Sequence, residues 1–164
     1  MTHFEIERKF LIEMPEIDLL KNFEGVRILE IVQTYTTRGV RLRKQTEKGE
    51  TVYISTEKRK VSDLTRIEEE REIGESEYRE LLAFADPDLS PIKKTRYALP
   101  FGGKIVEIDV FPFWEHQAFC EVELQSEEEK FSLPEFVKVI RELTSDKAYR
   151  NYSLAKEVPQ EEIF

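Results

Sequence analysis

The sequence is poor in cysteine, in long apolar runs and in basic charge. Cys120 is the only cysteine among 164 residues, which excludes an internal disulfide and fits a reducing compartment. No apolar run approaches the roughly 20 residues of a membrane span, and the charged first residues do not resemble a signal peptide. With 25 Lys and Arg against 34 Asp and Glu, the net charge of −9 argues against broad nucleic-acid binding. We therefore expect a soluble, cytoplasmic protein with no membrane contact and no nucleic-acid surface.

Charged residues are abundant, at 36% of the chain against about a quarter in a typical domain. Hydrophobic residues still make up 40% and aromatic residues 11%, which indicates a globular fold. The length suits one domain, and no repeat or low-complexity linker interrupts it. We expect a single domain over residues 1–157 and a frayed acidic tail over residues 158–164.

Short segments of alternating apolar and polar residues dominate the chain. They predict about eight strands joined by short polar turns, over 3–12, 27–36, 39–45, 51–58, 65–73, 93–100, 104–111 and 118–125. Helical spacing predicts short helices over 15–22, 75–85, 133–144 and 147–156. The pattern indicates an antiparallel sheet or barrel with a few helices beside it.

One face of nearly every predicted strand is charged and the other is apolar. In the first strand Glu5, Glu7 and Lys9 share a face, because alternate side chains of a strand point to opposite sides. The other charged faces hold Arg41 and Arg43; Thr56 and Lys58; Arg66, Glu68, Glu70 and Glu72; Lys94 and Arg96; Glu107 and Asp109; and Glu121 and Glu123. The opposite faces carry mostly Val, Ile and Leu.

Two interpretations fit these faces. The simpler one is a two-layer α+β domain, in which helices cover the apolar face and water covers the charged face. However, like charges alternate along single strands and would repel, with acids gathered on some strands and bases on others. In a closed barrel the same faces would line the interior, where ions and ligands must satisfy them. Carboxylates suit Mg²⁺ or Mn²⁺, and Arg and Lys suit phosphate, so such an interior would bind a metal-bound polyphosphate.

The motifs along the chain resemble those of the CYTH superfamily, also called the triphosphate tunnel metalloenzymes. "EIERK" is similar to its E-x-E-x-K signature. The others follow in order: "RLR" at 41–43, "TEK" at 56–58, "RIEEE" at 66–70, "KKTRY" at 93–97, "EID" at 107–109, "EVEL" at 121–124 and "DKAYRNYSLA" at 146–155. The signature alone is a weak motif, but the ordered series covers nearly the whole chain and is specific.

The resemblance implies an α+β fold with a closed eight-stranded antiparallel barrel, a few flanking helices, and a tunnel for triphosphate and metal. By position, the metal-binding acids are Glu5, Glu7, Glu121 and Glu123, and the triphosphate-binding bases are Arg41, Arg43, Lys58, Lys94 and Arg96. Glu68, Glu70 and Asp109 match further tunnel acids, and Lys9 matches the basic residue of the signature. Lys147 and Arg150 also lie near the family's last helix. Where relatives often carry aromatic residues, this chain has Glu69 and Arg71, which we expect to face outward.

The resemblance and the charged faces together favour hydrolysis of a triphosphate, either inorganic tripolyphosphate or a small organic triphosphate, with Mg²⁺ or Mn²⁺. Lys58, Lys94 and Lys9 are the candidate catalytic residues, because neighbouring cations lower the pKa of a lysine and let it act as a base. The alternatives are an adenylate cyclase of the class IV type and a polyphosphate- or nucleotide-binding module without turnover. The substrate, the metal and the oligomeric state stay open. Cys120 is expected to be a buried core thiol.

Overall fold

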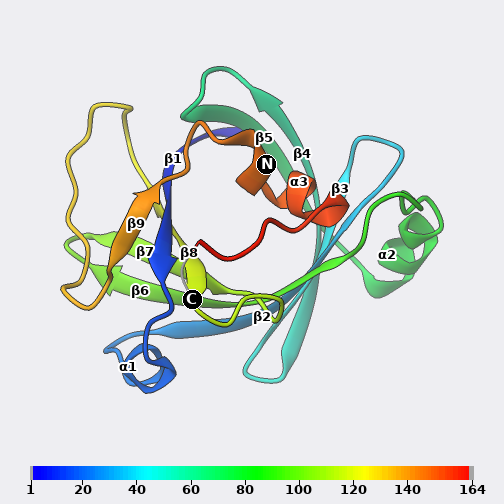
Figure 1. Ribbon diagram of the computed structural model, residues 1–164. Helices are drawn as coiled ribbons and strands as arrows, with labels where there is room; N and C mark the ends of the chain where they lie inside the picture. The colour runs from blue at the N-terminus through cyan, green and yellow to red at the C-terminus, as the bar shows by residue number, and fades with distance from the viewer. Residues whose placement is uncertain (1, 163–164) are drawn as a thin grey trace.

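The strands form one sheet that closes on itself. The computed structural model describes residues 2–162. The strands are β1 (Thr2–Glu13), β2 (Arg27–Tyr35), β3 (Arg41–Glu47), β4 (Glu50–Lys60), β5 (Thr65–Ile73), β6 (Ile92–Phe101), β7 (Lys104–Val110), β8 (Gln117–Glu123) and β9 (Val139–Glu142). Their order is β5-β4-β3-β2-β6-β7-β8-β1-β9, and a further pairing of β5 with β1 closes the ring (Figure 1). The predicted closed eight-stranded antiparallel barrel is confirmed.

Strand β1 is the seam of the barrel. Residues 7–13 pair with β8 on one edge, while residues 2–6 pair with β5 on the other. Beyond β5 that second edge is free, and β9 pairs with residues 10–12 there. The helix predicted over 133–144 is therefore wrong. The free edge of β1 offers main-chain hydrogen bonds, and the β-branched Val139 and Ile140 suit a strand, so tertiary pairing outweighs the helical spacing.

The apolar faces of the strands point outward and are covered. Helices α1 (Ile17–Lys21) and α2 (Glu75–Leu82), both predicted, lie outside the ring (Figure 1). Under α1 and residues 131–137 the cluster contains Leu20, Leu99, Ile108, Cys120 and Val122. Under α2 it contains Leu42, Ile73 and Tyr78. The charged faces are consequently left to line the interior.

Cys120 belongs to this outer core, as expected. Its side chain is fully buried, and burial raises the pKa of the thiol to about 12. The thiol is thus a packed apolar group and a poor nucleophile. No helix within residues 2–162 combines the length and the apolar character needed to cross a membrane.

The C-terminal segment fills one end of the barrel. The helix predicted over 147–156 is divided at Arg150, whose extended backbone (φ −70°, ψ 146°) separates the 3₁₀ turn η1 (Lys147–Tyr149) from α3 (Asn151–Lys156). An inner cluster closes this end, with Leu11, Phe111, Trp114, Phe119, Tyr149 and Leu154 among its members.

The acidic tail, expected to be frayed, makes defined contacts up to residue 162. Trp114 Nε1 donates a hydrogen bond to the Pro159 carbonyl at 2.9 Å, and the Glu162 amide donates to Gln117 Oε1 at 2.8 Å. Residues 163–164 of the expected tail lie outside the described residues. The charged interior therefore occupies the part of the barrel that this aromatic end leaves open.

Candidate functional site

The inner faces of the strands border two cavities. The first, which we call the basic chamber, has a volume of about 570 Å³; its lining includes Glu7, Lys9, Arg41, Lys58, Arg66 and Arg150. The second, which we call the paired chamber, has a volume of about 560 Å³; its lining includes Arg27, Arg43, Gln45, Arg96, Glu107 and Glu123. Along β2, Tyr35 lines the first chamber and Leu29 the second, and the fully buried Gln33 lies between them. The two cavities thus occupy opposite ends of one charged interior.

Three arginines of the basic chamber make no ion pair with a carboxylate of the described residues. Within residues 2–162, the Nε of Arg41 and the Nη2 of Arg150 are buried and have no hydrogen-bond partner. Arg66 donates to the main-chain oxygen of Ser62 at 2.6 Å rather than to an acid. A buried donor without a partner is unfavourable, because it has lost its hydrogen bonds to water. These groups would be satisfied by an anion in the chamber.

Lys58 stands in the same chamber but is paired. Its Nζ lies 2.8 Å from Glu5 Oε1 and 3.4 Å from Glu68 Oε2. Burial and Arg41 act to lower the pKa of Lys58, but Glu5, Glu7 and Glu68 outweigh them and raise it. The expectation of a lowered pKa is therefore wrong for Lys58, which stays an ammonium ion.

Lys9 holds the C-terminal segment in place. Its Nζ donates a hydrogen bond to the Tyr149 carbonyl at 2.7 Å and lies 4.0 Å from the centre of the Phe119 ring. Glu121 is 3.8 Å away. Burial lowers the pKa of Lys9 although Glu121 and Glu7 act in the opposite direction. These contacts join β1 to η1, which brings Lys147 and Arg150 to the chamber wall.

The expected metal-binding acids are only partly gathered. Burial, and then the charges of Glu121 and Glu5, raise the pKa of Glu7 well above its ordinary value. Glu123 is paired across the strands with Glu7 but is exposed and lines the paired chamber. In the described part of the chain, no group of three or more acids, histidines or cysteines is close enough to hold a metal by itself. A cation bound at Glu7 would nevertheless reduce the repulsion between its carboxylate and those of Glu121 and Glu5.

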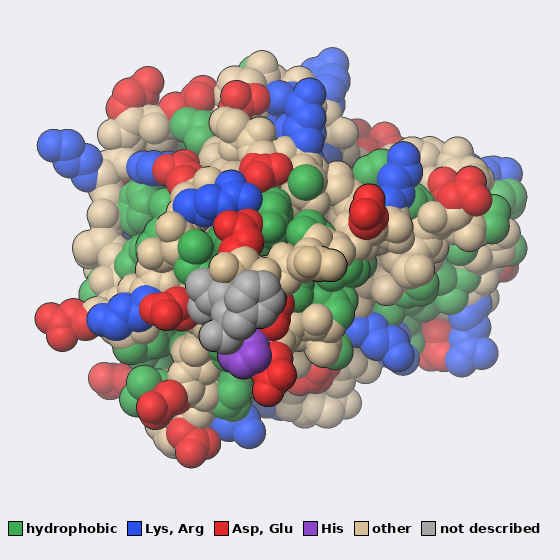
Figure 2. Space-filling view, viewed as in Figure 1, with side chains coloured by type: hydrophobic (Ala, Val, Ile, Leu, Met, Phe, Trp, Pro, Cys, Tyr) green, Lys and Arg blue, Asp and Glu red, His purple; other side chains and the backbone are tan. Residues whose placement is uncertain are grey.

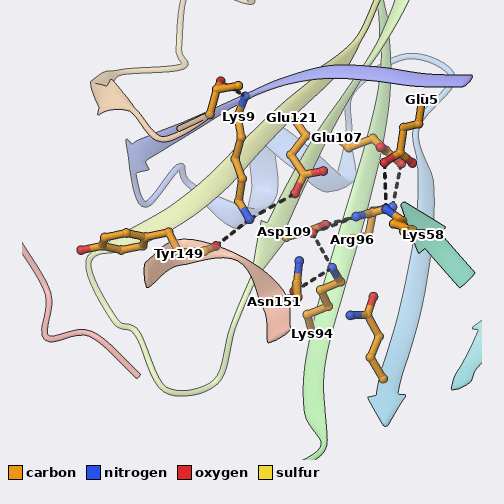
Figure 3. A network of polar contacts seen from close by, with 12 residues as sticks. Glu5, Lys9, Lys58, Lys94, Arg96, Glu107, Asp109, Glu121, Tyr149 and Asn151 are labelled. Atoms are coloured by element: carbon orange, nitrogen blue, oxygen red, sulfur yellow. Dashed lines mark hydrogen bonds and ion pairs between the residues drawn. The ribbon is translucent and has the colours of Figure 1, made fainter. Parts of the chain in front are cut away.

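A buried layer of ion pairs lies beside both chambers. Asp109 accepts from Lys94 at 2.8 Å and from Arg96 at 2.7 Å, and the side chains of Lys94 and Asp109 are each only 1% exposed. Figure 3 shows both cations converging on Asp109, with Asn151 beside Lys94. Burial lowers the pKa of Lys94 to about 7 despite Asp109, helped by Arg96 and Arg43. Lys94 is therefore poised to lose and regain a proton near neutral pH, as the sequence predicts.

The paired chamber contains cations that already have partners. Arg96 also binds Glu107 at 3.0 Å, and Arg27 binds Glu47 at 2.7 Å. Arg43 is the exception, since its Nη2 donates only to the neutral Gln33 Oε1, at 2.7 Å, and its Nε is buried without a partner. Burial, together with Arg41 and Arg96, lowers the pKa of Arg43 to about 9. Arg43 is therefore the cation of the paired chamber that an anion would satisfy.

The remaining predicted positions fall largely where the alternation put them. Glu68 is buried and Glu70 half-buried on the inner face of β5, whereas Glu69 and Arg71 are exposed, as expected. Glu72, also assigned to an inner face, is exposed near the end of that strand. The inner polar residues that were missed include Gln33, Gln45 and Asn151. The sequence did not indicate that Gln33 lies inside, because its neighbours on the inner face of β2 are the apolar Leu29 and Ile31.

Charges of both signs are mixed on the outer face that Figure 2 presents. Figure 2 shows Lys and Arg side chains interspersed with Asp and Glu side chains over the face that it presents. The ion pair of Arg8 with Glu142 and the pair of Arg71 with Glu77 are of this external kind. Such exposed pairs contribute little to stability.

The chain is similar over most of its length to several solved structures. No protein-family model and no curated protein sequence matches the chain. The structure of the inorganic triphosphatase NE1496 is 27% identical, covers 95% of this chain and 97% of that one, and has a TM-score of 0.57. A second NE1496 structure is 29% identical over 94% of this chain and 99% of that one, also with a TM-score of 0.57.

Two archaeal proteins share the fold at lower identity. PH1819 from Pyrococcus horikoshii OT3 is 20% identical over 75% of this chain and 80% of that one, with a TM-score of 0.53. A conserved protein from Pyrococcus furiosus is 22% identical over 76% and 80% of the two chains, with a TM-score of 0.52. The closed barrel, the ordered motifs and the likeness to NE1496 over nearly the whole of both chains place this protein in the CYTH, or triphosphate tunnel metalloenzyme, superfamily.

Proposed function

We propose that this protein hydrolyses a triphosphate with the help of a divalent cation, Mg²⁺ or Mn²⁺. The observation that carries the proposal is the basic chamber, where Arg41, Arg66 and Arg150 meet without carboxylate partners. Arginine suits phosphate oxygens because its planar fork donates two parallel hydrogen bonds. The likeness to the triphosphatase NE1496 supports the same substrate class.

The acids of the chamber fit a hard divalent cation. Glu5 and Glu7 line the chamber with carboxylate groups, and Glu121, which is not part of the lining, is close enough to help raise the pKa of Glu7. Mg²⁺ is commonly held by one or two carboxylates together with phosphate oxygens of the substrate, so a complete set of protein ligands is not required. When bound, the cation would offset phosphate charge and polarise the phosphoryl group.

We assign separate roles in binding, charge stabilisation and proton transfer to the side chains. Arg41, Arg66 and Arg150 would bind the non-bridging oxygens, and Lys58 would add a fixed positive charge. Lys94 is the candidate acceptor of the proton from the attacking water, since its pKa is lowered to about 7; its buried side chain meets the chamber wall through its hydrogen bond to Asn151. Water adds to the terminal phosphorus, the bond to the bridging oxygen breaks, and orthophosphate leaves together with the shortened phosphate.

A phosphate-release assay tests the proposal directly. Tripolyphosphate, thiamine triphosphate and ATP are each incubated with Mg²⁺, with Mn²⁺ and with a chelator. Release that depends on the metal supports the proposal, and no release in any combination overturns it. Cyclic AMP and pyrophosphate from ATP would instead identify a cyclase, whereas tight metal-dependent binding without turnover would identify a binding module.

The role of the acids is tested by Glu7→Gln with Glu128→Gln as its matched control. Glu128 is exposed in the turn after β8, so its substitution should leave the rate unchanged. Glu7→Gln should raise the Mg²⁺ concentration needed for half-maximal rate, because a charged ligand of the cation is lost. Equal Mg²⁺ dependence in the two variants would contradict the metal site.

A further inference from the structure

Glu162, the last described residue of the acidic tail, is bound to three separate elements. Its two carboxylate oxygens accept hydrogen bonds from Arg141 on β9, at 3.0 and 2.9 Å. One of these oxygens also accepts a hydrogen bond from the hydroxyl of Tyr149 in η1. The Glu162 amide donates to Gln117 on β8. A single residue of the tail therefore ties together β8, β9 and η1.

Tyr149 is fixed at both of its ends. Its ring is buried, and its centre lies 6.1 Å from the ring centres of Trp114 and Phe119. The hydroxyl meets Glu162, whereas the carbonyl accepts the hydrogen bond from Lys9 Nζ, with the ring pointing away from Lys9 (Figure 3). Burial, and then the hydrogen bond to Glu162, raise the pKa of Tyr149 to about 12, so the hydroxyl stays protonated and able to donate.

Arg150 follows Tyr149 directly and lines the basic chamber. Its Nη2 has no partner within residues 2–162 that would hold it in place, so its position depends on the main chain from which it projects. That main chain is held on one side by Lys9 and, through the ring of Tyr149, on the other side by Glu162. The place at which the Arg150 guanidinium enters the chamber is therefore set outside the chamber.

Arg141 carries the same link to the start of η1. Its Nη2 also donates to Asp146 Oδ2 at 3.1 Å, and Asp146 Oδ1 accepts a hydrogen bond from the Ala148 amide at 3.0 Å. Asp146 is thus the residue that caps η1. Both the cap and the last residue of η1 are consequently joined to the pair formed by Glu162 and Arg141.

Building on the proposed function, we propose that Glu162 is a positioning residue for triphosphate binding. Glu162 is not part of the chamber lining and acts through Tyr149, whose bound hydroxyl holds the main chain next to Arg150. The direction of the N–H groups decides how well an arginine binds phosphate, so a displaced η1 would weaken the contact. The acidic tail thus contributes to the affinity of a site that it does not line.

The simpler role for Glu162 is that of an exposed ion pair. The side chains of Arg141 and Glu162 are 40% and 29% exposed, and such pairs usually contribute little. In that case the aromatic packing alone holds Tyr149, and loss of the carboxylate changes neither affinity nor rate. Loss of the carboxylate would, however, take an acceptor from the hydroxyl of a buried tyrosine, which is unfavourable.

The experiment measures KM and kcat with Mg²⁺ and tripolyphosphate, or the triphosphate that the wild type prefers. Glu162→Gln should raise KM about tenfold and keep kcat within about twofold, because it weakens binding of the substrate and of the transition state alike. Tyr149→Phe removes the same hydrogen bond from the other side and should act similarly. Glu161→Gln, the matched control, breaks the neighbouring pair with His116, at 3.0 Å, and should change KM by less than about twofold.

A second background separates positioning from a general loss of structure. If Glu162 acts through Arg150, adding Glu162→Gln to Arg150→Ala should raise KM by less than about twofold further. A general structural role would instead lower the melting temperature and raise KM by the same factor in both backgrounds. That result would overturn the inference, as would a KM in Glu162→Gln equal to that in Glu161→Gln.

Failure of the proposed function and failure of the positioning role give different results. If no triphosphate is hydrolysed, calorimetry with tripolyphosphate and Mg²⁺ measures the dissociation constant in the same variants. Binding weakened about tenfold by Glu162→Gln, but not by Glu161→Gln, would support the positioning role although the hydrolase proposal had failed. A wild type that neither hydrolyses nor binds a triphosphate would overturn both. Hydrolysis with equal KM in all variants would overturn the positioning role alone.

Discussion

The basic chamber and the paired chamber both contain arginine, lysine and glutamate, but they differ in how these charges are matched. In the paired chamber Arg96 and Arg27 each bind a carboxylate at 3.0 Å or less. In the basic chamber Arg41 and Arg150 retain buried nitrogen atoms without a partner within the described residues. Among the described residues, Arg43 is the one arginine of the paired chamber with an unsatisfied buried nitrogen, whereas an anion would complete both Arg41 and Arg150 in the basic chamber.

This difference shows why the number of charges does not locate a binding site. A buried cation that has an acid partner needs no ligand, and removal of the acid destabilises the folded protein. A buried cation without a partner keeps its desolvation penalty until a ligand arrives. The state of pairing, which depends on distances across the barrel, is therefore the better guide. The predictions below test it, beginning with the largest effect.

Breaking the buried layer beside the two chambers should have the largest effect. Asp109→Asn leaves Lys94 and Arg96 without their shared carboxylate, so the free energy of unfolding should fall by about 3–5 kcal/mol. Glu107→Gln, whose side chain is 29% exposed, should lower it by about 1 kcal/mol or less. Urea denaturation measures both values. Equal losses would show that the Asp109 layer is not a distinct buried unit.

Removing one arginine from each chamber compares them directly. Arg41→Ala should lower kcat/KM for a triphosphate by about 100-fold or more, because it removes a donor to the phosphates whose buried Nε has no partner among the described residues. Arg27→Ala breaks an exposed pair with Glu47 and should change the rate by less than about threefold. Steady-state phosphate release provides the measurement. Similar losses in both variants would remove the distinction between the chambers.

Ligand binding should stabilise the fold through the basic chamber. Tripolyphosphate with Mg²⁺ at about 100 times the dissociation constant adds about 2.7 kcal/mol. For a domain of this length that corresponds to a rise in melting temperature of about 5–10 °C. Arg41→Ala should lose most of the rise, and Arg27→Ala should keep it. Thermal melts with and without ligand test this, and an unchanged wild-type melting temperature would count against the chamber.

A further prediction concerns the pH dependence set by Lys94. Because the pKa of Lys94 is lowered to about 7, kcat/KM should rise about tenfold per pH unit below pH 7 and level off above it. Lys94→Met should remove this dependence along with most of the rate. Lys93→Met, at the adjacent exposed position, should keep it. A pH profile unaltered in shape by Lys94→Met would exclude Lys94 as the base.

The lowered pKa of Lys94 also predicts the direction in which stability changes with pH. The ordinary pKa of lysine, 10.5, describes the unfolded chain, so the folded protein binds fewer protons than the unfolded chain between about pH 7 and 10.5. Through Lys94 alone, stability should therefore increase as the pH rises across that window. Wild type and Lys94→Met, compared by denaturation at several pH values, would show the difference.

The sequence by itself determined the barrel strands and their faces. Alternation placed each of the eight strands within two residues of its observed bounds, because a strand with one buried face must repeat with period two. The same alternation put Glu7, Arg41, Lys58 and Asp109 on inner faces. Periodicity alone did not distinguish a two-layer domain from a closed barrel. The resemblance of the motif series to a known superfamily predicted the closed barrel.

The tertiary structure determined two features that no local sequence pattern indicates, namely strand β9 and the pairing of the inner charges. Residues 139–142 became β9 because β1 offered a free edge, although their spacing is also that of a helix. The sequence also did not show which charges pair, since alternation places both Lys58 and Lys94 on charged strand faces. Acids around Lys58 raise its pKa, while burial lowers that of Lys94. Both outcomes depend on distances between strands far apart in the chain, which exist only once the sheet has closed.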